Sequence, residues 1–295
     1  MRRLCYSYIV RLGKNGFFKL AVLLSAGLGI FCTTLCAKLD YYLTGLTNGL
    51  IGGYVQDVPI IDHYIFKWIL FLAAYFAFFI SYFEGTEYAD GTIRNKILAG
   101  YSRKQIYLAG MLADMLAGWI MFSVYWIAGL FAGFTALGIF REMSIREFVF
   151  YVLCLYAIMA ALAALFRMIS MIVPNRTASM IICIGLILVL LLIPLYQTGN
   201  LQWHEYFTLE FDNGDIVYHV GDKCPFYIGG IRREISEFML DFLPGGPLIQ
   251  FMCFPWLDEI DLIYLKIPVI FLGAAVFTLF STMAGLRVFW TEELK

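Results

Sequence analysis

Six stretches of about 20 apolar residues dominate the sequence and decide which class of fold it can adopt. A helix advances about 1.5 Å per residue, so a stretch of this length crosses the hydrocarbon core of a bilayer. The six stretches lie near residues 18–38, 64–83, 110–137, 148–167, 177–196 and 267–288. Hydrophobic residues make up 61% of the chain and charged residues only 15%, which is not the composition of a soluble domain. The sequence therefore predicts an all-α integral membrane protein with six transmembrane helices, forming a single domain over residues 1–295.

The positions of the basic residues predict how these spans are oriented. Most of the 21 lysine and arginine residues lie before the first span, between the second and third, between the fourth and fifth, or after the last. Because basic residues accumulate in cytoplasmic loops, both termini of this multi-pass protein are expected to be cytoplasmic. The residues assigned to this side are Arg2, Arg3, Arg11, Lys14, Lys19, Arg94, Lys96, Arg103, Lys104, Arg167, Arg176, Arg287 and Lys295. The net charge of −1 gives no support for nucleic-acid binding.

Residues 1–16 have the pattern of a basic amphipathic helix. Arginine and lysine are interleaved with apolar side chains at helical spacing, so one face is apolar and the other is positively charged. Such a helix is expected to lie on the cytosolic membrane surface, with its apolar face among the lipid head groups. That face comprises Leu4, Cys5, Tyr8, Ile9 and Leu12. A signal peptide is the alternative, but the apolar run that follows is long enough to span and no cleavage site precedes a polar start.

The longest charged interruption in the first two-thirds of the chain covers residues 84–106. Between two spans, such a segment is expected to lie in water at the membrane face. Acidic residues precede basic ones, which complements a helix dipole, and Asp90 and Arg94 have the favourable i, i+4 spacing. Gly100 provides a C-terminal stop, and Ser102 begins a capping box for the next helix. The sequence therefore predicts a short helix, a turn, and a second helix that enters the membrane.

The residue types in this segment also carry a family resemblance. They are Glu87-Tyr88, Gly91-Thr92-Ile93-Arg94-Asn95-Lys96, Gly100, Ser102-Arg103 and Ile106-Tyr107. This pattern resembles the cytosolic loop of ABC-2 family exporter permeases, in particular those of the bacitracin- and lantibiotic-immunity branch. The motif covers about a tenth of the chain, and the remainder resembles the family in its topology. The alternative is an ordinary polar loop that joins two spans.

The resemblance implies a role for each main segment. Residues 84–104 would form a coupling helix that docks into a groove on a separate ATPase subunit, and residues 1–16 would form an elbow helix. Ile93, Ile97 and Tyr88 are expected to bury in that groove, because a water-exposed loop offers them no other partner. The functional unit would contain two permease chains, identical or homologous, and two ATPase chains. The implied coupling residues are Glu87, Tyr88, Asp90, Gly91, Thr92, Ile93, Arg94, Asn95, Lys96, Ile97, Gly100, Ser102 and Arg103.

The segment from residue 197 to 266 is too long for a plain connector and is expected to be extracellular. Asn213-Gly214, flanked by alternating apolar residues, predicts a small β-hairpin. Apolar residues at helical spacing predict an amphipathic helix over residues 231–242. The Pro244-Gly245-Gly246-Pro247 sequence ends this helix, and residues 248–254 are expected to form a second one. The resemblance implies half-inserted external helices at this position.

A few polar and sulfur-containing residues remain without an assigned role. Asp114 lies near the cytosolic end of the third span, where the pattern is compatible both with a solvated carboxylate and with one paired at an interface. Cys224 and Cys253 share one polar segment, and the sequence does not decide whether they form a disulfide. His204 and His219 lack metal-site spacing and are interpreted as surface residues, so no metal site is predicted.

The third span contains two glycines in a GxxxG spacing. Gly129 and Gly133 would allow another helix backbone to approach closely. We interpret them as packing residues within one subunit, in preference to a contact between subunits.

The chain contains no motif for ATP hydrolysis. A Walker-type phosphate loop, HExxH and GxSxG are all absent, so a catalytic activity of its own is not predicted. We expect a permease subunit that binds no cofactor, contacts membrane lipid, and depends on ATP and Mg²⁺ held by the partner ATPase. Its aromatic spans, which carry almost no charge, predict export of an amphipathic substrate. The acidic external segment suits a cationic peptide, and the resemblance to immunity permeases likewise implies a membrane-active antimicrobial peptide. The alternative is a non-transporting sensor or scaffold that holds a cytosolic partner through residues 84–104, and the third interpretation is an embedded lipid-modifying enzyme.

Overall fold

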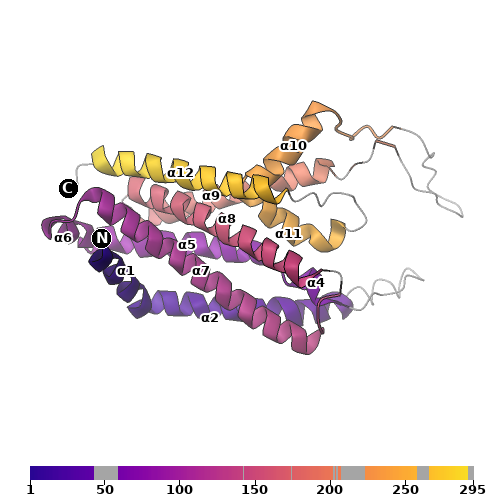
Figure 1. The fold of residues 1–295 in the computed structure, drawn as a ribbon, viewed down its shortest axis with the longest axis horizontal. Coiled ribbons are helices and arrows are strands. Elements are labelled where there is room, and N and C mark those ends of the chain that lie inside the picture. Colours follow the sequence, from indigo (N-terminus) through magenta and orange to yellow (C-terminus); the bar gives the residue numbers. More distant parts are fainter. Residues whose placement is uncertain are drawn as a thin grey trace, which may run out of the picture.

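Figure 1 shows the fold in a computed structural model, a bundle of long helices that run roughly side by side. The structure describes residues 1–42, 59–141, 143–173, 175–201, 203, 205–206, 223–257 and 266–291, with all their side chains except those of Ala89 and residues 253–257. No β-strand occurs among these residues, which contain an isolated antiparallel bridge between Tyr206 and Lys223. The predicted hairpin around Asn213-Gly214 lies outside the described residues, between the two partners of this bridge.

Six helical segments are long and apolar enough to cross a membrane, as predicted. Polar caps lengthen two of them beyond the predicted bounds, because Ser102 and Ser144 each form a capping box in front of the apolar run. The six segments make the chain a multi-pass membrane protein. They are Gly16–Tyr42 (α2, Gly16–Ile30, and the π-helical η1, Phe31–Cys36), Ile61–Tyr88 (α4, Ile61–Tyr64, and α5, Ile69–Ala89), Arg103–Ala136 (α7), Ile145–Ile172 (α8), Arg176–Leu201 (α9) and Ile267–Thr291 (α12).

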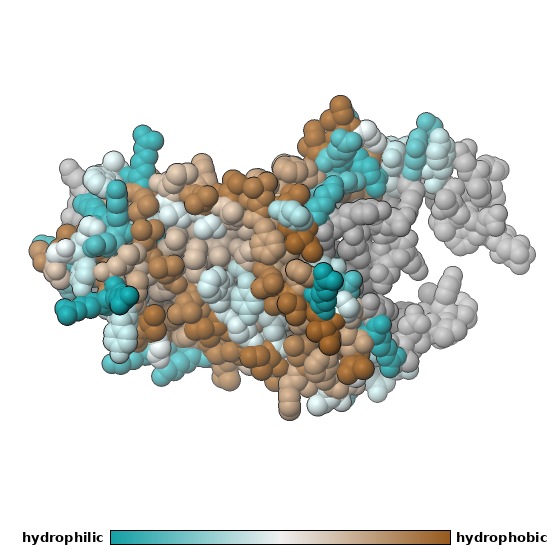
Figure 2. Space-filling view, viewed as in Figure 1, coloured by the Kyte–Doolittle hydropathy of each residue, from teal (hydrophilic) through white to brown (hydrophobic). Residues whose placement is uncertain are grey.

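The two ends of the bundle carry different elements. The short helices α1 (Arg2–Lys14) and α6 (Thr92–Leu98) lie at one end, together with the last turns of α12, and we call this the α6 end (Figure 1). Helix α10 (Ile231–Phe242) projects from the opposite end, which we call the α10 end. Figure 2 shows hydrophobic residues over the middle of this face and hydrophilic residues gathered towards the two ends. This distribution is the one expected of a protein that spans a membrane.

Helix α1 confirms the predicted amphipathic helix, but most of its apolar face points into the protein. The side chain of Asn15 separates α1 from α2 by accepting hydrogen bonds of 2.8 and 3.2 Å from the first turn of α2. Leu4, Tyr8 and Leu12 are buried in the core, and α1 packs along α7. Of the predicted apolar face, Ile9 is exposed. The expectation that this face lies among lipid head groups is therefore wrong, because the protein itself covers it.

The connection between α5 and α7 contains two turns built on glycine. Helix α5 ends at Ala89, and Gly91 (φ +63°) turns the chain into α6. Gly100 (φ +88°) ends α6 as predicted, since the N–H groups of Gly100 and Tyr101 donate to carbonyls in its last turn at 2.9 and 3.2 Å. Asp90 caps the end of α5, so the expectation that it begins the short helix was wrong.

The two predicted helices of the segment before the last span are confirmed as α10 and α11 (Gly245–Leu257), the latter beginning earlier than expected. The buried side chain of Asp241 connects α10 to α11 and to the start of α12. It accepts hydrogen bonds from Nε2 of Gln250 in α11 (3.1 Å) and from the backbone N–H of Lys266 before α12 (3.4 Å). Helix α11 packs against α9, α5 and α4, so the chain turns back into the α10 end of the bundle after α10 (Figure 1).

Helices α2 and α7 approach each other closely through glycine. A Cβ atom on Gly29 would overlap the backbone carbonyl of Tyr125, so only glycine fits there. Gly129 packs against Gly29, and the hydroxyl of Thr33 lies 3.0 and 3.1 Å from the carbonyl oxygens of these two glycines. Gly133 packs against Thr33. The GxxxG pair therefore serves packing within one chain, which agrees with the interpretation of the sequence.

We predict that Gly29→Ala destabilises the bundle, because the added methyl group meets backbone that cannot rotate away. Overpacking of this kind costs about 1–3 kcal/mol. Gly27→Ala is the matched control: it lies two residues earlier in the same helix, and its Cβ would meet no atom within 4 Å. The measurement is the thermal unfolding midpoint of each purified protein in detergent. Equal midpoints for the two variants would contradict the close approach of α2 and α7.

Candidate functional site

Six charged side chains meet inside the α6 end of the bundle, and we call them the ionic cluster. They come from five helices, which are far apart in the sequence. The members are Arg11 of α1, Glu84 and Glu87 of α5, Lys96 of α6, Asp114 of α7 and Arg167 of α8. Glu84, Glu87, Asp114 and Arg167 are at most 1% exposed. Ionised groups are rare at such depth in a membrane bundle and are functional candidates by default.

Arg167 organises the inner half of the cluster. Its Nη1 atom lies 2.7 Å from Oε1 of Glu84 and 2.7 Å from Oδ2 of Asp114. One guanidinium therefore bridges two carboxylates from α5 and α7, and it ties α8 to both helices. The Arg167 guanidinium also lies over the rings of Tyr107 and Tyr8, at 5.5 and 5.8 Å from their centroids.

Local sequence makes room for this arginine. A Cβ atom at Gly110 would overlap the guanidinium of Arg167, so the side chain lies directly on the backbone of α7. A Cβ atom at Gly285 of α12 would likewise overlap the hydroxyl of Tyr107. These two glycines let α8 and α12 pack close to α7 at the level of the cluster. Neither glycine belongs to a motif that marks it in the sequence.

Glu87 organises the outer half of the cluster, which lies next to α1 and α6. Its Oε1 atom forms ion pairs with Arg11 and, at 2.6 Å, with Lys96. Its Oε2 atom accepts a hydrogen bond of 3.0 Å from the hydroxyl of Tyr8. Arg11 also donates to the hydroxyl of Thr86 at 2.8 Å. This single buried carboxylate thus holds α1 and α6 against the end of α5.

Tyr8 connects the two halves. Its ring lies below the ammonium group of Lys96, 3.6 Å from Nζ to centroid, and also contacts the guanidinium of Arg167. Burial raises the pKa of Tyr8 well above its ordinary value, and the negative charge of Glu87 adds to this shift. Burial lowers the pKa of Lys96, an effect that the charge of Glu87 opposes. Both shifts have the same origin, because the protein removes water from this end of the bundle.

The charges of the cluster balance as a whole and not in each half. Glu84, Asp114 and Arg167 together carry one excess negative charge, whereas Glu87, Arg11 and Lys96 carry one excess positive charge. Each half therefore stabilises the other. Several polar atoms are left over. Oε1 of Glu84 is engaged in the ion pair with Arg167, but Oε2 of Glu84, Oδ1 of Asp114, and Nε and Nη2 of Arg167 have no hydrogen-bond partner among the described residues. The inner half consequently retains donors and acceptors for a second pairing pattern.

The cluster consists of carboxylate, guanidinium and ammonium groups, with the phenol of Tyr8 between its two halves. It contains no thiol or serine beside a histidine, and the described residues contain no group of three or more His, Cys, Asp and Glu side chains that could hold a metal ion. Cys224 is a buried free thiol, and the side chain of Cys253 is outside the described part of the chain. What the cluster can do is mechanical, since it fixes the relative positions of five helices.

The structure divides the predicted coupling residues into an anchoring group and an exposed group. Ile93 is 2% exposed and belongs to the core of this chain, and Ile97 and Tyr88 pack against the same core. The argument that these three side chains have no partner of their own is therefore wrong. Glu87 is fully buried and Lys96 is half-buried. The exposed members are Asp90, Arg94, Asn95, Gly100 and Ser102, while Gly91, Thr92 and Arg103 are half-buried.

Leu98, which lies outside the predicted set, and Arg103, which belongs to it, change how this end of the molecule is understood. Leu98, the last residue of α6, is 76% exposed, which makes it the main apolar side chain on the outer face of α6. Arg103 donates hydrogen bonds to the carbonyls of Phe289 and Trp290, at 2.8 and 3.2 Å, and so joins the start of α7 to the end of α12. The turn after α6 is thus attached to the last span as well.

Arg167 lies elsewhere than predicted, and the structure decides the environment of Asp114, which the sequence leaves open. Arg167 was expected in a turn between the fourth and fifth spans, but α8 continues to Ile172 and the side chain faces the interior. Asp114 is paired with it and is not solvated. One sequence signal could have predicted this pairing, namely complementary charge. Two acidic residues and one basic residue lie in or next to apolar runs near the same predicted side of the membrane: Glu84, Asp114 and Arg167.

In comparison with known proteins, no family model and no curated protein matches the sequence.

We predict that Arg167→Met strongly destabilises the protein, because it leaves Glu84 and Asp114 buried without a cation. Breaking a buried ion pair by removing one partner costs about 3–5 kcal/mol. Replacing all three residues, as in Arg167→Met with Glu84→Gln and Asp114→Asn, should recover most of this loss. The measurement is the thermal unfolding midpoint in detergent. A triple variant that is no more stable than Arg167→Met would show that the cost does not arise from unpaired charge.

Tyr8 makes the stability of the protein depend on pH in the alkaline range. Because the pKa of Tyr8 is raised in the folded protein, its contribution to stability is complete below about pH 10, the ordinary tyrosine value, and is lost as pH rises from there through the folded-state pKa. Tyr8→Phe should be less stable than wild type by about 1 kcal/mol at neutral pH, and this difference should narrow above pH 10. Unfolding midpoints at pH 7 to 11.5 test this. A stability difference between the two proteins that stays constant to pH 11.5 would argue against a raised pKa of Tyr8.

Proposed function

We propose that this protein is the transmembrane permease subunit of an ATP-driven exporter, and that α6 is the helix through which a separate ATPase subunit acts on it. The observation that carries the proposal is the ionic cluster. It connects α6 and α1 to the interior of the bundle through Glu87 and Lys96, and it continues to α7 and α8 through Arg167. A displacement of α6 would therefore be transmitted to four other helices.

The shape of α6 supports a docking role. It has only seven residues, too few to be stable as an isolated helix, so its position depends on the contacts made by Ile93 and Lys96. Its opposite face presents Leu98, Arg94 and Asn95 away from the bundle. A short, firmly anchored helix with one exposed leucine suits insertion into a groove on another protein. In this version of the proposal Leu98 replaces Ile93 as the apolar residue that enters the groove.

The inner half of the cluster supports movement as well as rigidity. Arg167 retains unused donors, and Glu84 and Asp114 retain unused acceptors. Helices α5, α7 and α8 could therefore shift past one another and form new pairs without leaving an ion alone in the membrane. Alternating access in an exporter requires two such arrangements of one set of helices.

The energy for transport is proposed to come from ATP and Mg²⁺ bound by the partner, since this chain has no phosphate-binding loop. Two permease chains, identical or homologous, would complete the pathway with two ATPase chains. The proposed location is a bacterial cell membrane, with the α6 end and both termini in the cytoplasm. This orientation rests on the basic residues assigned to that side.

The proposed substrate is amphipathic, and a membrane-active antimicrobial peptide is the leading example. The charged side chains buried within the spans are engaged in the ionic cluster or, like Asp62, accept hydrogen bonds from backbone. The other buried side chains of the spans are mainly aromatic and aliphatic. Walls made of such side chains suit a molecule that enters from the membrane better than a bare ion.

The exposed face of α6 also fits a second function. A sensor or scaffold that does not transport could hold a cytosolic partner through the same residues. The two functions differ in one observable: an exporter pair hydrolyses ATP at a rate that depends on the permease and its substrate, whereas a scaffold binds its partner without such stimulation.

We predict that Leu98→Asp prevents the co-expressed ATPase from copurifying and abolishes protection of a sensitive bacterium against peptide antibiotics. A charge in the centre of a buried contact removes a hot spot, which is typically worth at least 2 kcal/mol. Ile139→Asp is the matched control, because Ile139 is equally exposed (76%) but lies between α7 and α8 at the α10 end. Full copurification and protection with Leu98→Asp would rule out docking through this face. Ile93→Asp is unsuitable, since Ile93 is part of the core.

A further inference from the structure

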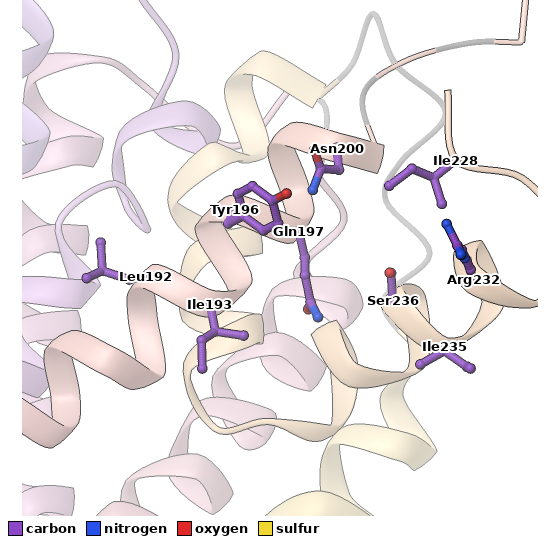
Figure 3. A pocket seen from close by; sticks show the side chains of 9 residues that line it. All are labelled: Leu192, Ile193, Tyr196, Gln197, Asn200, Ile228, Arg232, Ile235 and Ser236. Atoms are coloured by element: carbon purple, nitrogen blue, oxygen red, sulfur yellow. The ribbon is translucent and has the colours of Figure 1, made fainter. Parts of the chain in front are cut away.

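A groove of about 560 Å³ lies between α9 and α10, at the opposite end of the molecule from the ionic cluster (Figure 3). Its walls combine two kinds of side chain. Leu192, Ile193 and Ile235 make it apolar, whereas Gln197, Arg232 and Ser236 bring polar groups to it. Figure 3 shows Gln197 extending from α9 towards Ser236 of α10, with Arg232 one turn earlier on α10. The volume is in the range of binding sites for small molecules.

The position of the groove relates it to the membrane boundary. Leu192 and Ile193 are exposed on the outward face of α9, a helix apolar enough to span the membrane. Tyr196 follows them towards the helix end, as aromatic residues do at a membrane interface. Helix α10 is amphipathic, with exposed Ile231 and Phe238 beside charged residues, which is typical of a helix in the head-group region. The groove thus extends from the hydrocarbon to the head groups.

Arg232 gives the groove an uncompensated positive charge. Among the described residues, no carboxylate lines the groove and none forms an ion pair with Arg232. Its neighbour Arg233 differs, because Arg233 pairs with Glu237 at 3.1 Å. Glu237 also has Lys266 at 3.9 Å, so this acid is engaged elsewhere. An anionic group in the groove would therefore meet a guanidinium that is not already neutralised.

Gln197 supplies an independent indication of a ligand. Its Oε1 atom is buried and accepts no hydrogen bond from a described residue. A buried amide oxygen without a donor is unfavourable, and a hydroxyl group in the groove would satisfy it once the side chain of Gln197, which lines the groove, turns its oxygen towards the ligand. A ligand that matches this groove would therefore combine three features: a hydrocarbon chain, an anionic group and a hydroxyl donor.

We propose that this groove binds an anionic phospholipid with a hydroxylated head group, of the phosphatidylglycerol type. One acyl chain lies against Leu192, Ile193 and Ile235, the phosphate pairs with Arg232, and a head-group hydroxyl donates to Gln197. The bound lipid joins α9 to α10, which precedes the last span. The site is independent of docking at α6 and of the exporter proposal.

A second groove provides a contrast. It lies beside α2 and α5, has a volume of about 720 Å³, and is lined by apolar side chains such as Leu24, Phe31 and Phe71, with Ser25 and Tyr75 as its polar members. The described residues that line it include no charged group, so we expect acyl chains there without selection among lipids. Preference for one head group is expected only at the groove that contains Arg232.

Native mass spectrometry of the purified full chain tests the proposal, with phosphatidylglycerol and phosphatidylcholine of the same acyl chains added in equal amounts. Wild type should retain phosphatidylglycerol in preference, and Arg232→Gln should reduce its binding about tenfold, the effect of losing one charge-assisted hydrogen bond. Arg233→Gln is the matched control and should bind as wild type does. Ser236→Trp, which fills the groove while keeping Arg232, should also reduce binding, whereas Ser7→Trp on the exposed surface of α1 should not.

Three results would overturn the proposal. Equal retention of the two lipids by wild type would remove the selectivity that Arg232 is proposed to provide. Equal losses in Arg232→Gln and Arg233→Gln would reduce the effect to general surface charge. Displacement of the lipid by glycerol phosphate at the same concentration would show that the site takes a soluble phosphate, with no contribution from the apolar wall.

Discussion

The removal of charged groups from water is the constraint on which the α6 end of this structure depends. Each ion of the buried cluster would cost several kcal/mol alone in a low-dielectric environment. The cost is offset only when opposite charges from different helices meet, so the helices have little freedom to pack in another register. Arg167 can lie only where Glu84 and Asp114 are both within reach. Apolar packing brings the spans together, and the cluster selects one arrangement of them.

The same constraint explains why the short elements at this end are ordered. Helices α1 and α6 are amphipathic and would gain little by folding alone. Glu87 provides one buried acceptor for Tyr8, Arg11 and Lys96, which come from both helices. Helix α1, helix α6 and the bundle are therefore parts of one structural unit. A partner protein at the exposed face of α6 would act on that unit as a whole.

Much of the fold could be predicted from the sequence, because the signals involved are local. Hydropathy located all six spans, capping and glycine rules located the stop at Gly100 and the cap at Ser102, and the spacing of apolar residues located helix α10. The errors concern contacts between distant residues. A hydropathy average treats Arg167 as the end of a span, although its partners in α5 and α7 allow the helix to continue past it. Periodicity shows that Tyr8 and Ile93 lie on apolar faces, but it does not show whether lipid, another protein or the same chain covers them.

The order of the cluster along the chain has a consequence for how the protein is made. Glu84 and Asp114 are synthesised before Arg167, and α8 is the fourth of the six spans. While α8 is still in the ribosome, two acidic side chains already belong to spans that lack their cation, and protonation or contact with water must keep them tolerable at the membrane. Glu87 is in a different situation, since Arg11 precedes it and Lys96 follows nine residues later. The cation of the inner half thus arrives only with α8, and a chain interrupted before that helix would keep two acidic side chains without their partner.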